Sequence, residues 1–191
     1  MRVIGIDPGS VITGTGIIEI SGGKIYLVEY DTLKMSSKEP MKNRLKKVYD
    51  FCIKKISLFH PDEFAIETAF YGKNIQSTLK LGQVRGAAIV AAMNKQLNVG
   101  EYSPREIKKS VTGNGASSKQ KVLSIIKSIL AIKEKPKFFD SSDALSIALC
   151  HYFCISRNVQ FSGKGFTGRK NKSGWKEFVE SNPEKILKKQ I

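Results

Sequence analysis

The sequence has few cysteines and histidines, the residues that stabilise many small proteins through disulfide bonds or bound metal ions. Of its 191 residues only three are cysteines, Cys52, Cys150 and Cys154, and two are histidines. An odd number of cysteines without a Cys-x-x-Cys pair argues against a disulfide framework and predicts reduced thiols. Cys150, His151 and Cys154 lie close together in an apolar run, but no fourth ligand is near them in sequence. We expect them to pack in the core rather than to bind a metal ion.

Long apolar runs are missing as well. No window approaches the ~20 apolar residues of a membrane span. Asp7 interrupts the N-terminal segment where the apolar part of a secretory signal would have to continue. With 41% hydrophobic and 26% charged residues, the chain is too apolar for a disordered protein and too polar for a membrane bundle. We therefore expect a soluble, cytoplasmic protein with one buried core.

Acidic residues are scarce relative to basic ones. The chain has 32 Lys plus Arg against 17 Asp plus Glu, a formal charge of +15. Residues 1–154 contribute 23 − 14 = +9, and residues 155–191 contribute 9 − 3 = +6. A surplus spread over the whole chain favours a polyanionic partner, because each cation placed near a phosphate releases a counterion. Solubility alone is the other explanation for this charge.

The apolar pattern predicts an initial group of strands followed by alternating strands and helices. Runs bounded by turn residues predict strands at Arg2–Asp7, Thr13–Ile20, Lys24–Asp31, Glu63–Glu67 and Val99–Ser103. Segments expected to be helical are Met41–Phe59, Asn74–Lys95, Lys119–Ile132 and Asp140–Phe153. This order predicts an α/β fold in which a mixed sheet is covered by helices on both faces.

The composition changes near residue 157. We expect residues 1–156 to form one domain and residues 157–191 to form a basic, flexible C-terminal tail, because glycines there alternate with Lys and Arg. A short helix near Trp175 could dock the end of the tail.

Four acidic residues occupy places that suggest one site. Asp7 and Glu67 end two predicted strands, while Asp140 and Asp143 lie one turn apart at the start of a predicted helix. Ligand sites in open α/β sheets collect at the carboxyl ends of the strands. Crowded carboxylates need a cation, and oxygen ligands without His or thiolate select Mg²⁺ or Mn²⁺. Two such ions about 3.5–4 Å apart hydrolyse phosphodiesters, so the pattern predicts a nuclease.

Each acid also has a purely structural interpretation. Asp140 could cap its helix, Asp143 could complement the helix dipole, and Asp7 could be an ordinary turn residue. Other catalytic motifs fit poorly. The segment 113–119 lacks the Gly-Lys-Ser/Thr ending of a phosphate loop. The segment 7–16 could belong to an actin-like sugar kinase, but that fold has two lobes and needs a much longer chain.

Several segments, taken in order, resemble the RuvC-type Holliday-junction resolvases of the ribonuclease-H-like superfamily. The resemblance covers about residues 1–154. The segments that carry it are Ile4–Ser10 with Thr13–Gly16, Ile66–Asn74, Leu79–Gly86, Tyr102–Lys108, Val111–Gly115 with Lys119, and Asp140–Leu145 with Cys150–His151. The resemblance implies a ribonuclease-H-like, mixed five-stranded sheet with helices on both faces. It also implies a homodimer that resolves four-way DNA junctions by symmetric paired nicks, in recombination and DNA repair.

Residue roles and partners follow from the same resemblance. It implies two Mg²⁺ ions in each active site, with Mn²⁺ as a substitute, held by Asp7, Glu67, Asp140 and Asp143 as the catalytic acids. Lys119 would be catalytic as well. The residues that would contact DNA are Phe70, Lys73, Lys108 and Lys119. The implied partners are junction DNA, a second copy of the chain, and the RuvA and RuvB branch-migration proteins. The protein itself would be cytoplasmic in a bacterium and associated with the nucleoid.

Two alternatives to this function remain open. The chain could be a catalytically silent junction-binding scaffold, or another ribonuclease-H-like nuclease that cuts RNA–DNA hybrids or transposon ends. Phe70 could also be a core aromatic, and Lys108 and Lys119 could be solvated helix ends.

Overall fold

The structure, a computed structural model, describes residues 1–68, 74–132 and 139–162, and of residues 139–141 and 157–162 it describes only the backbone. Most of the predicted tail, residues 163–191, therefore lies outside the described residues. In the part of the chain that is described, no helix is long and apolar enough to cross a membrane.

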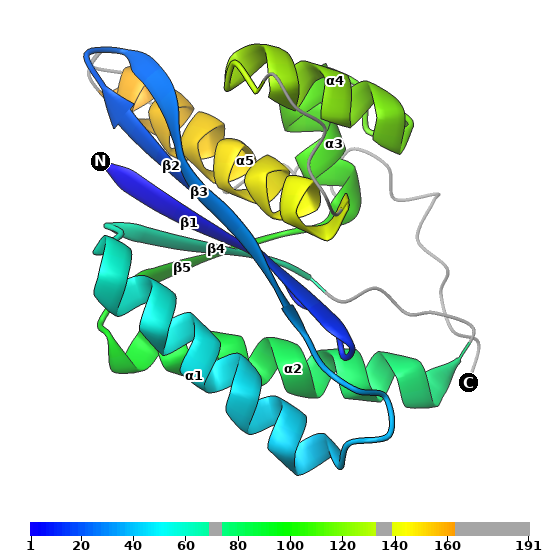
Figure 1. Cartoon of the computed structure of the whole chain (residues 1–191). Coiled ribbons are helices and arrows are strands. Elements are labelled where there is room, and N and C mark those ends of the chain that lie inside the picture. Colours follow the sequence, from blue (N-terminus) through cyan, green and yellow to red (C-terminus); the bar gives the residue numbers. More distant parts are fainter. Residues whose placement is uncertain (69–73, 133–138, 163–191) are drawn as a thin grey trace, which may run out of the picture. The chain divides into compact units, whose positions relative to one another are not determined.

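A five-stranded mixed sheet forms the centre of the fold (Figure 1). Its strands are β1 (Arg2–Asp7), β2 (Ile12–Ser21), β3 (Lys24–Lys34), β4 (Glu63–Glu67) and β5 (Asn98–Tyr102), in the order β3-β2-β1-β4-β5. Strand β1 is antiparallel to β2 and parallel to β4, and β4 is parallel to β5. The predicted mixed sheet of five strands is therefore confirmed.

Helices cover both faces of the sheet, as predicted (Figure 1). Helices α1 (Met41–Phe59) and α2 (Ile75–Asn94) lie on one face, and α3 (Pro104–Thr112), α4 (Lys119–Ile129) and α5 (Phe139–Ser162) lie on the other. Because side chains alternate along a strand, Ile4 and Ile6 of β1 pack in the core beneath α1 and α2. Val3 of the same strand packs in the core beneath α4 and α5. By this alternation Asp7 belongs to the α5 face.

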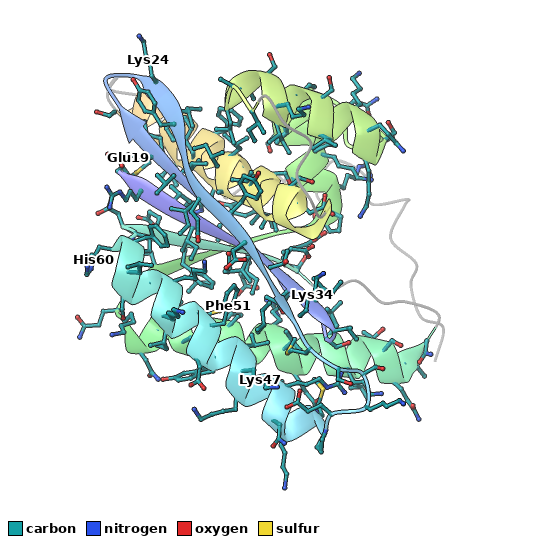
Figure 2. All side chains as sticks on the ribbon, viewed as in Figure 1. Glu19, Lys24, Lys34, Lys47, Phe51 and His60 are labelled. Carbon is teal, nitrogen blue, oxygen red and sulfur yellow. The ribbon has the colours of Figure 1, made fainter. Side chains whose placement is uncertain are left out.

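Several element ends follow local sequence signals. His60 ends α1 in a left-handed conformation, with φ 46°, immediately before Pro61. Asn74 caps α2 through its side chain, and Ser103 forms a capping box with Glu106 at the start of α3. The β2–β3 turn uses Gly22 and Gly23, both with positive φ, and Lys24 marks its far side (Figure 2).

The predicted end of the helix that begins at Lys119 is wrong. Apolar residues continue at helical spacing to Ile132, but α4 ends at Ile129 and Leu130 is its cap residue. Ala131 then takes a left-handed conformation with φ 51°. The apolar side chains of Leu130 and Ile132 still pack in the α5-side core. Burial therefore explains their spacing, although the helix has already ended.

Helix α5 lies against β1 and β2 at a pair of glycines. Gly5 of β1 is paired with Gly16 of β2. A Cβ atom at Gly5 would collide with the carbonyl oxygen of Ala144, and one at Gly16 would lie 2.6 Å from the backbone nitrogen of Leu145. The absence of side chains here allows the first turns of α5 to approach the sheet closely. This approach fixes the position of Asp143, the residue before Ala144.

Candidate active site

Two strand ends and one helix bring acidic residues to the same edge of the sheet. Ile6 of β1 is paired with Ile66 of β4 in parallel register. Asp7 and Glu67 directly follow this pair, so they leave adjacent strand ends in the same direction. Ala65, two residues before Glu67, belongs to the same core cluster as Ile147 of α5, so alternation places Glu67 on the α5 face as well. Asp143 reaches this edge from the first turns of α5.

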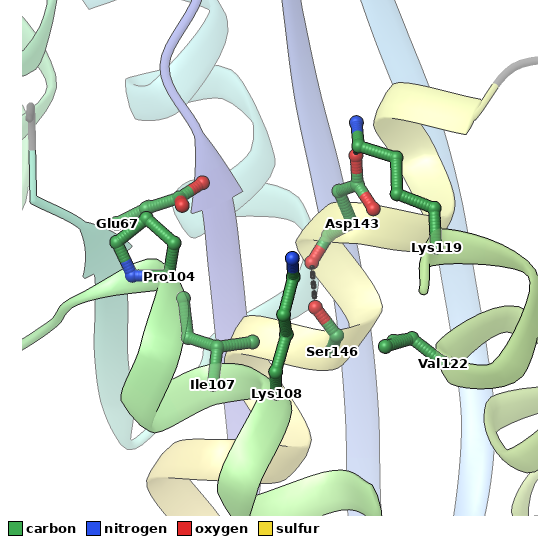
Figure 3. A pocket seen from close by; sticks show the side chains of 8 residues that line it. All are labelled: Glu67, Pro104, Ile107, Lys108, Lys119, Val122, Asp143 and Ser146. Atoms are coloured by element: carbon green, nitrogen blue, oxygen red, sulfur yellow. Dashed lines mark hydrogen bonds and ion pairs between the residues drawn. The ribbon is translucent and has the colours of Figure 1, made fainter. Parts of the chain in front are cut away.

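A cavity of about 150 Å³ lies at this edge of the sheet (Figure 3). Its lining residues are Glu67, Pro104, Ile107, Lys108, Lys119, Val122, Asp143 and Ser146. Lys119 Nζ forms an ion pair with Asp143 Oδ2 at 3.0 Å. Figure 3 shows that the Lys108 side chain points into the space between Glu67 and Asp143. Two carboxylates and two ammonium groups therefore meet in one cavity.

The lysines are positioned by short helices and a well-bonded loop. Lys108 projects from α3, whose start is fixed by Pro104 and the capping box. Lys119 is the first residue of α4, directly after the N-cap Ser118. Between the two helices, Thr112 Oγ1 lies 2.8 Å from Ser117 Oγ and also donates to Asn114 O at 2.9 Å. These hydrogen bonds restrict the loop that presents Lys119 to the cavity.

Glu67 is electrostatically perturbed. Its pKa is raised from 4.5 to about 7, mainly by burial and also by the negative charge of Asp143. Lys119 and Lys108 act in the opposite direction but do not offset these effects. The cavity therefore carries a carboxylate whose charge is only partly compensated, a state that a bound cation would relieve.

The donor set fits a hard divalent cation. Glu67 and Asp143 supply carboxylate oxygens, which are the ligands that Mg²⁺ and Mn²⁺ prefer, and the described residues that line the cavity include no thiolate or imidazole. Within the side chains that the structure describes, no cluster of three or more His, Cys, Asp or Glu residues is present. The side chain of Asp140 is outside that set, although its backbone lies in the first turn of α5.

The predicted site residues divide into two groups. Glu67, Asp143, Lys108 and Lys119 line the same cavity, and Asp7 ends the strand beside Glu67. Phe70, Lys73 and the Asp140 side chain lie outside the described residues.

Sequence reasoning missed the part of the wall formed by uncharged residues. Ser146 lines the cavity and donates through Oγ to the carbonyl oxygen of Asp143 at 2.6 Å. Its position three residues after Asp143 on one helix was the available signal. Pro104 and Ile107 had no comparable signal, because their contribution depends on the packing of α3 against the sheet.

The histidine and cysteines of α5 have structural surroundings. His151 is buried, lies 2.8 Å from Tyr102 Oη through Nδ1, and approaches Glu63 Oε2 at 3.3 Å through Nε2. Burial lowers the pKa of His151, although Glu63 opposes the change. Cys150 is buried and contributes to the core between α5 and β4.

Comparisons with known proteins agree with the geometry. Residues 3–151 match the family described as crossover junction endodeoxyribonuclease RuvC. The chain is 44% identical to the protein of that name from Salinibacter ruber, over 97% of this chain and 99% of the relative. It is 42% identical to the one from Chloroherpeton thalassium, over 98% of this chain and 100% of the relative.

Solved structures give the same result. The structure of Thermus thermophilus RuvC in complex with Holliday junction substrate has a TM-score of 0.78 and 32% identity, covering 83% of this chain and 96% of that one. A yeast mitochondrial Holliday junction resolvase, at 15% identity and a TM-score of 0.57, shares the fold. The predicted ribonuclease-H-like fold class is thus confirmed. With the family match spanning most of its length, the chain belongs to the RuvC family of crossover junction endodeoxyribonucleases.

Proposed function

We propose that this chain binds four-way DNA junctions and hydrolyses one phosphodiester bond in each of two opposing strands, during recombination and DNA repair. The cavity that brings Glu67 and Asp143 together with Lys108 and Lys119 carries the proposal. Carboxylates can bind metal ions and ammonium groups can bind phosphates. The lining can therefore bind both the metal ion and the substrate phosphate of a metal-assisted phosphodiester hydrolysis. The net charge of +15 suits a polyanionic substrate.

Membership in this nuclease family indicates dependence on a divalent metal ion. We assign Mg²⁺, two ions per site, with Mn²⁺ as a substitute, to the oxygens of Asp7, Glu67, Asp140 and Asp143. Such ions, when bound, polarise the phosphodiester and lower the pKa of the attacking water. Glu67 binds a proton near neutral pH because its pKa is about 7. It must release that proton when the cation binds, which couples cation affinity to pH.

The lysines have separate roles in the proposal. Lys119 holds Asp143 by an ion pair but is 66% exposed, so its ammonium group can also reach a phosphate that approaches from solvent. Lys108 lies deeper, between the two carboxylates, where it balances the negative charge of the site and faces the scissile phosphate. Phe70 and Lys73, in the segment between β4 and α2, are proposed as contacts to DNA at the junction centre.

The proposed dimer uses an exposed face of α2. Ile75 and Leu79 are exposed near its start, and Val90 and Met93 near its end. Between them, a Cβ atom at Gly82 or Gly86 would meet nothing within 4 Å. At 100° per residue these six residues lie on one side of the helix, opposite the buried Val84, Ala88 and Ala91.

Such a face allows close approach of the same helix from a second copy. A two-fold symmetric dimer would present two active sites to a substrate with two scissile strands. We also propose that the protein acts with the RuvA and RuvB branch-migration proteins and is associated with the bacterial nucleoid.

The test compares a mobile synthetic four-way junction with a linear duplex of the same sequence, in Mg²⁺ and in EDTA. We expect paired nicks in the junction only, lost in EDTA. Glu67→Gln and Asp143→Asn should lower the nicking rate by about 100-fold or more, since even groups that only support metal ligands cost 10–100-fold. Both variants should bind the junction in EDTA at least as well as the wild type, because Asp143→Asn removes a negative charge and Glu67→Gln removes one wherever Glu67 is ionised.

Glu19→Gln is the matched control. Glu19 forms an ion pair with Arg2 on β1, away from the cavity, and its substitution should leave the nicking rate unchanged. Tight junction binding without nicks would identify a scaffold instead of a nuclease. Equal cutting of the linear duplex would identify a nuclease of another specificity.

A further inference from the structure

The turn after Asp7 accepts hydrogen bonds from three separate parts of the chain. It joins β1 to β2 through residues 8–11, and three consecutive carbonyl oxygens in it each accept a hydrogen bond. Thr13 Oγ1 donates to Gly9 O at 2.9 Å, and the backbone nitrogen of Met35 donates to Val11 O at 2.8 Å. Between them, Ser10 O accepts from the side chain of Arg44 at 2.7 Å. The turn is also tight, because a Cβ atom at Gly9 would collide with the carbonyl oxygen of Ile12.

Arg44 reaches this turn from helix α1, on the opposite face of the sheet from the cavity. Only 5% of its surface is exposed. Its Nη1 makes the hydrogen bond to Ser10 O, while its Nε is buried and has no hydrogen-bond partner in the structure. Among the side chains that the structure describes, no carboxylate forms an ion pair with Arg44.

A buried arginine that hydrogen-bonds to a neutral carbonyl oxygen contributes little to the stability of a fold. A buried charge without a paired carboxylate carries a desolvation cost that one hydrogen bond to a neutral carbonyl only partly offsets. Replacing such a group by an apolar side chain of similar length is often neutral for stability or even favourable. Stability alone therefore does not account for an arginine at this position, whereas the side-chain hydrogen bond that it makes among the described residues is to the turn that follows Asp7.

We infer that Arg44 is a positioning residue for Asp7, acting through the 8–11 turn. The guanidinium fixes Ser10, three residues after Asp7, and so fixes the direction in which β1 ends beside Glu67. This inference rests on the proposed function, because it treats Asp7 as a ligand of the divalent cation. Replacing a group that hydrogen-bonds directly to a metal ligand typically changes metal affinity or activity by about 10–100-fold, and we take this range as the scale for a residue that acts through the adjoining turn.

The test measures cation binding without DNA and without cleavage. Thermal midpoints of the wild type, Arg44→Met and Arg44→Lys are followed as Mn²⁺ is added, which gives an apparent cation affinity. We expect Arg44→Met to weaken that affinity by about 10–100-fold. Its junction binding in EDTA should remain unchanged. Arg44→Lys should recover part of the loss, because an ammonium group can still donate to Ser10 O. Nicking by Arg44→Met should be restored in part by excess cation.

Lys55→Met is the matched control. Lys55 is a second buried cation on α1, but it pairs with Glu29 at 2.5 Å and Asp31 at 2.7 Å on β3, away from the cavity. Its loss should lower the unfolding free energy without changing the cation affinity. If Arg44→Met shifts stability but not cation affinity, or if Lys55→Met shifts cation affinity as much, the inference is wrong. A wild type that binds Mn²⁺ but nicks no junction would contradict the proposed function alone.

Discussion

At the scale of single residues, Glu67 shows how the fold changes the pKa of a glutamate side chain. A strand end that packs between α3 and α5 removes its carboxylate from water, and Asp143 adds a second negative charge. Both effects raise the pKa of Glu67, to about 7. The same arrangement that suits a cation therefore makes the cation-free protein less stable once Glu67 ionises.

This raised pKa predicts how stability depends on pH. Because the folded pKa lies above the ordinary value of 4.5, the folded state binds a proton more tightly than the unfolded state. The associated stability is full below about pH 4.5 and is lost as pH rises through 7. In EDTA, Glu67→Gln should be more stable than the wild type by an amount that grows between pH 4.5 and 7 and reaches roughly 2–3 kcal/mol. Denaturant unfolding at several pH values measures it.

Asp50→Asn provides the comparison for this prediction. Asp50 is an exposed carboxylate paired with Lys46 on α1, and its replacement should change the unfolding free energy by about 0.5 kcal/mol or less. Added Mg²⁺ should reverse the order of Glu67→Gln and wild type at pH 8. A constant difference between the two proteins from pH 4.5 to 8 would mean that Glu67 is not perturbed by its surroundings.

At the scale of elements, the site depends on how closely α5 approaches the sheet. Gly5 and Gly16 are paired across β1 and β2, and together they leave space for the backbone of Ala144 and Leu145. A helix raised by one side chain would carry Asp143 away from Glu67 and Lys119. The position of Asp143 in the cavity therefore depends on the absence of side chains at Gly5 and Gly16.

Gly5→Ala should test this link. The added methyl group meets backbone atoms of Ala144 and Ala148, which cannot move aside as a flexible side chain could. We expect a loss of about 1–3 kcal/mol in unfolding free energy, together with a loss of nicking larger than the unfolded fraction accounts for. Lys24→Ala, at the exposed start of β3, should change neither quantity. Full nicking activity in a destabilised but folded Gly5→Ala protein would show that activity does not depend on the close approach of α5 to the sheet.

The elements also show which features the sequence could predict. Ends fixed by local chemistry, such as His60 before Pro61, were predictable because the signal lies within a few residues. The clustering of Glu67 with Asp143 was predictable from the rule that ligand sites collect at strand ends. The pairing of Gly5 with Gly16 and the contact of Arg44 with Ser10 were not predictable, because no general rule brings these positions together as it does for acids at strand ends. Their position is set by strand register and helix packing, for which a single sequence carries no direct signal.

At the scale of the whole molecule, α2 has one face buried against the sheet and one face exposed. Apolar residues are exposed on the second face at both ends of the helix, around glycines that present bare backbone. Isolated apolar residues on a surface need no explanation, but six positions aligned on one helix face indicate a contact surface. In the proposed dimer this face meets its copy and sets the distance between the two active sites.

Leu79→Asp should therefore disrupt the dimer, because it places a charge on the face that the second copy covers. Sedimentation should show a monomer, and paired nicking should fall more steeply than junction binding, since one monomer cuts only one strand. Leu58→Asp is the control: Leu58 on α1 is 62% exposed, almost the same as the 63% of Leu79, but it lies on another helix. If both variants remain dimers, the contact surface lies elsewhere. If both become monomers, the effect belongs to added charge and not to the α2 face.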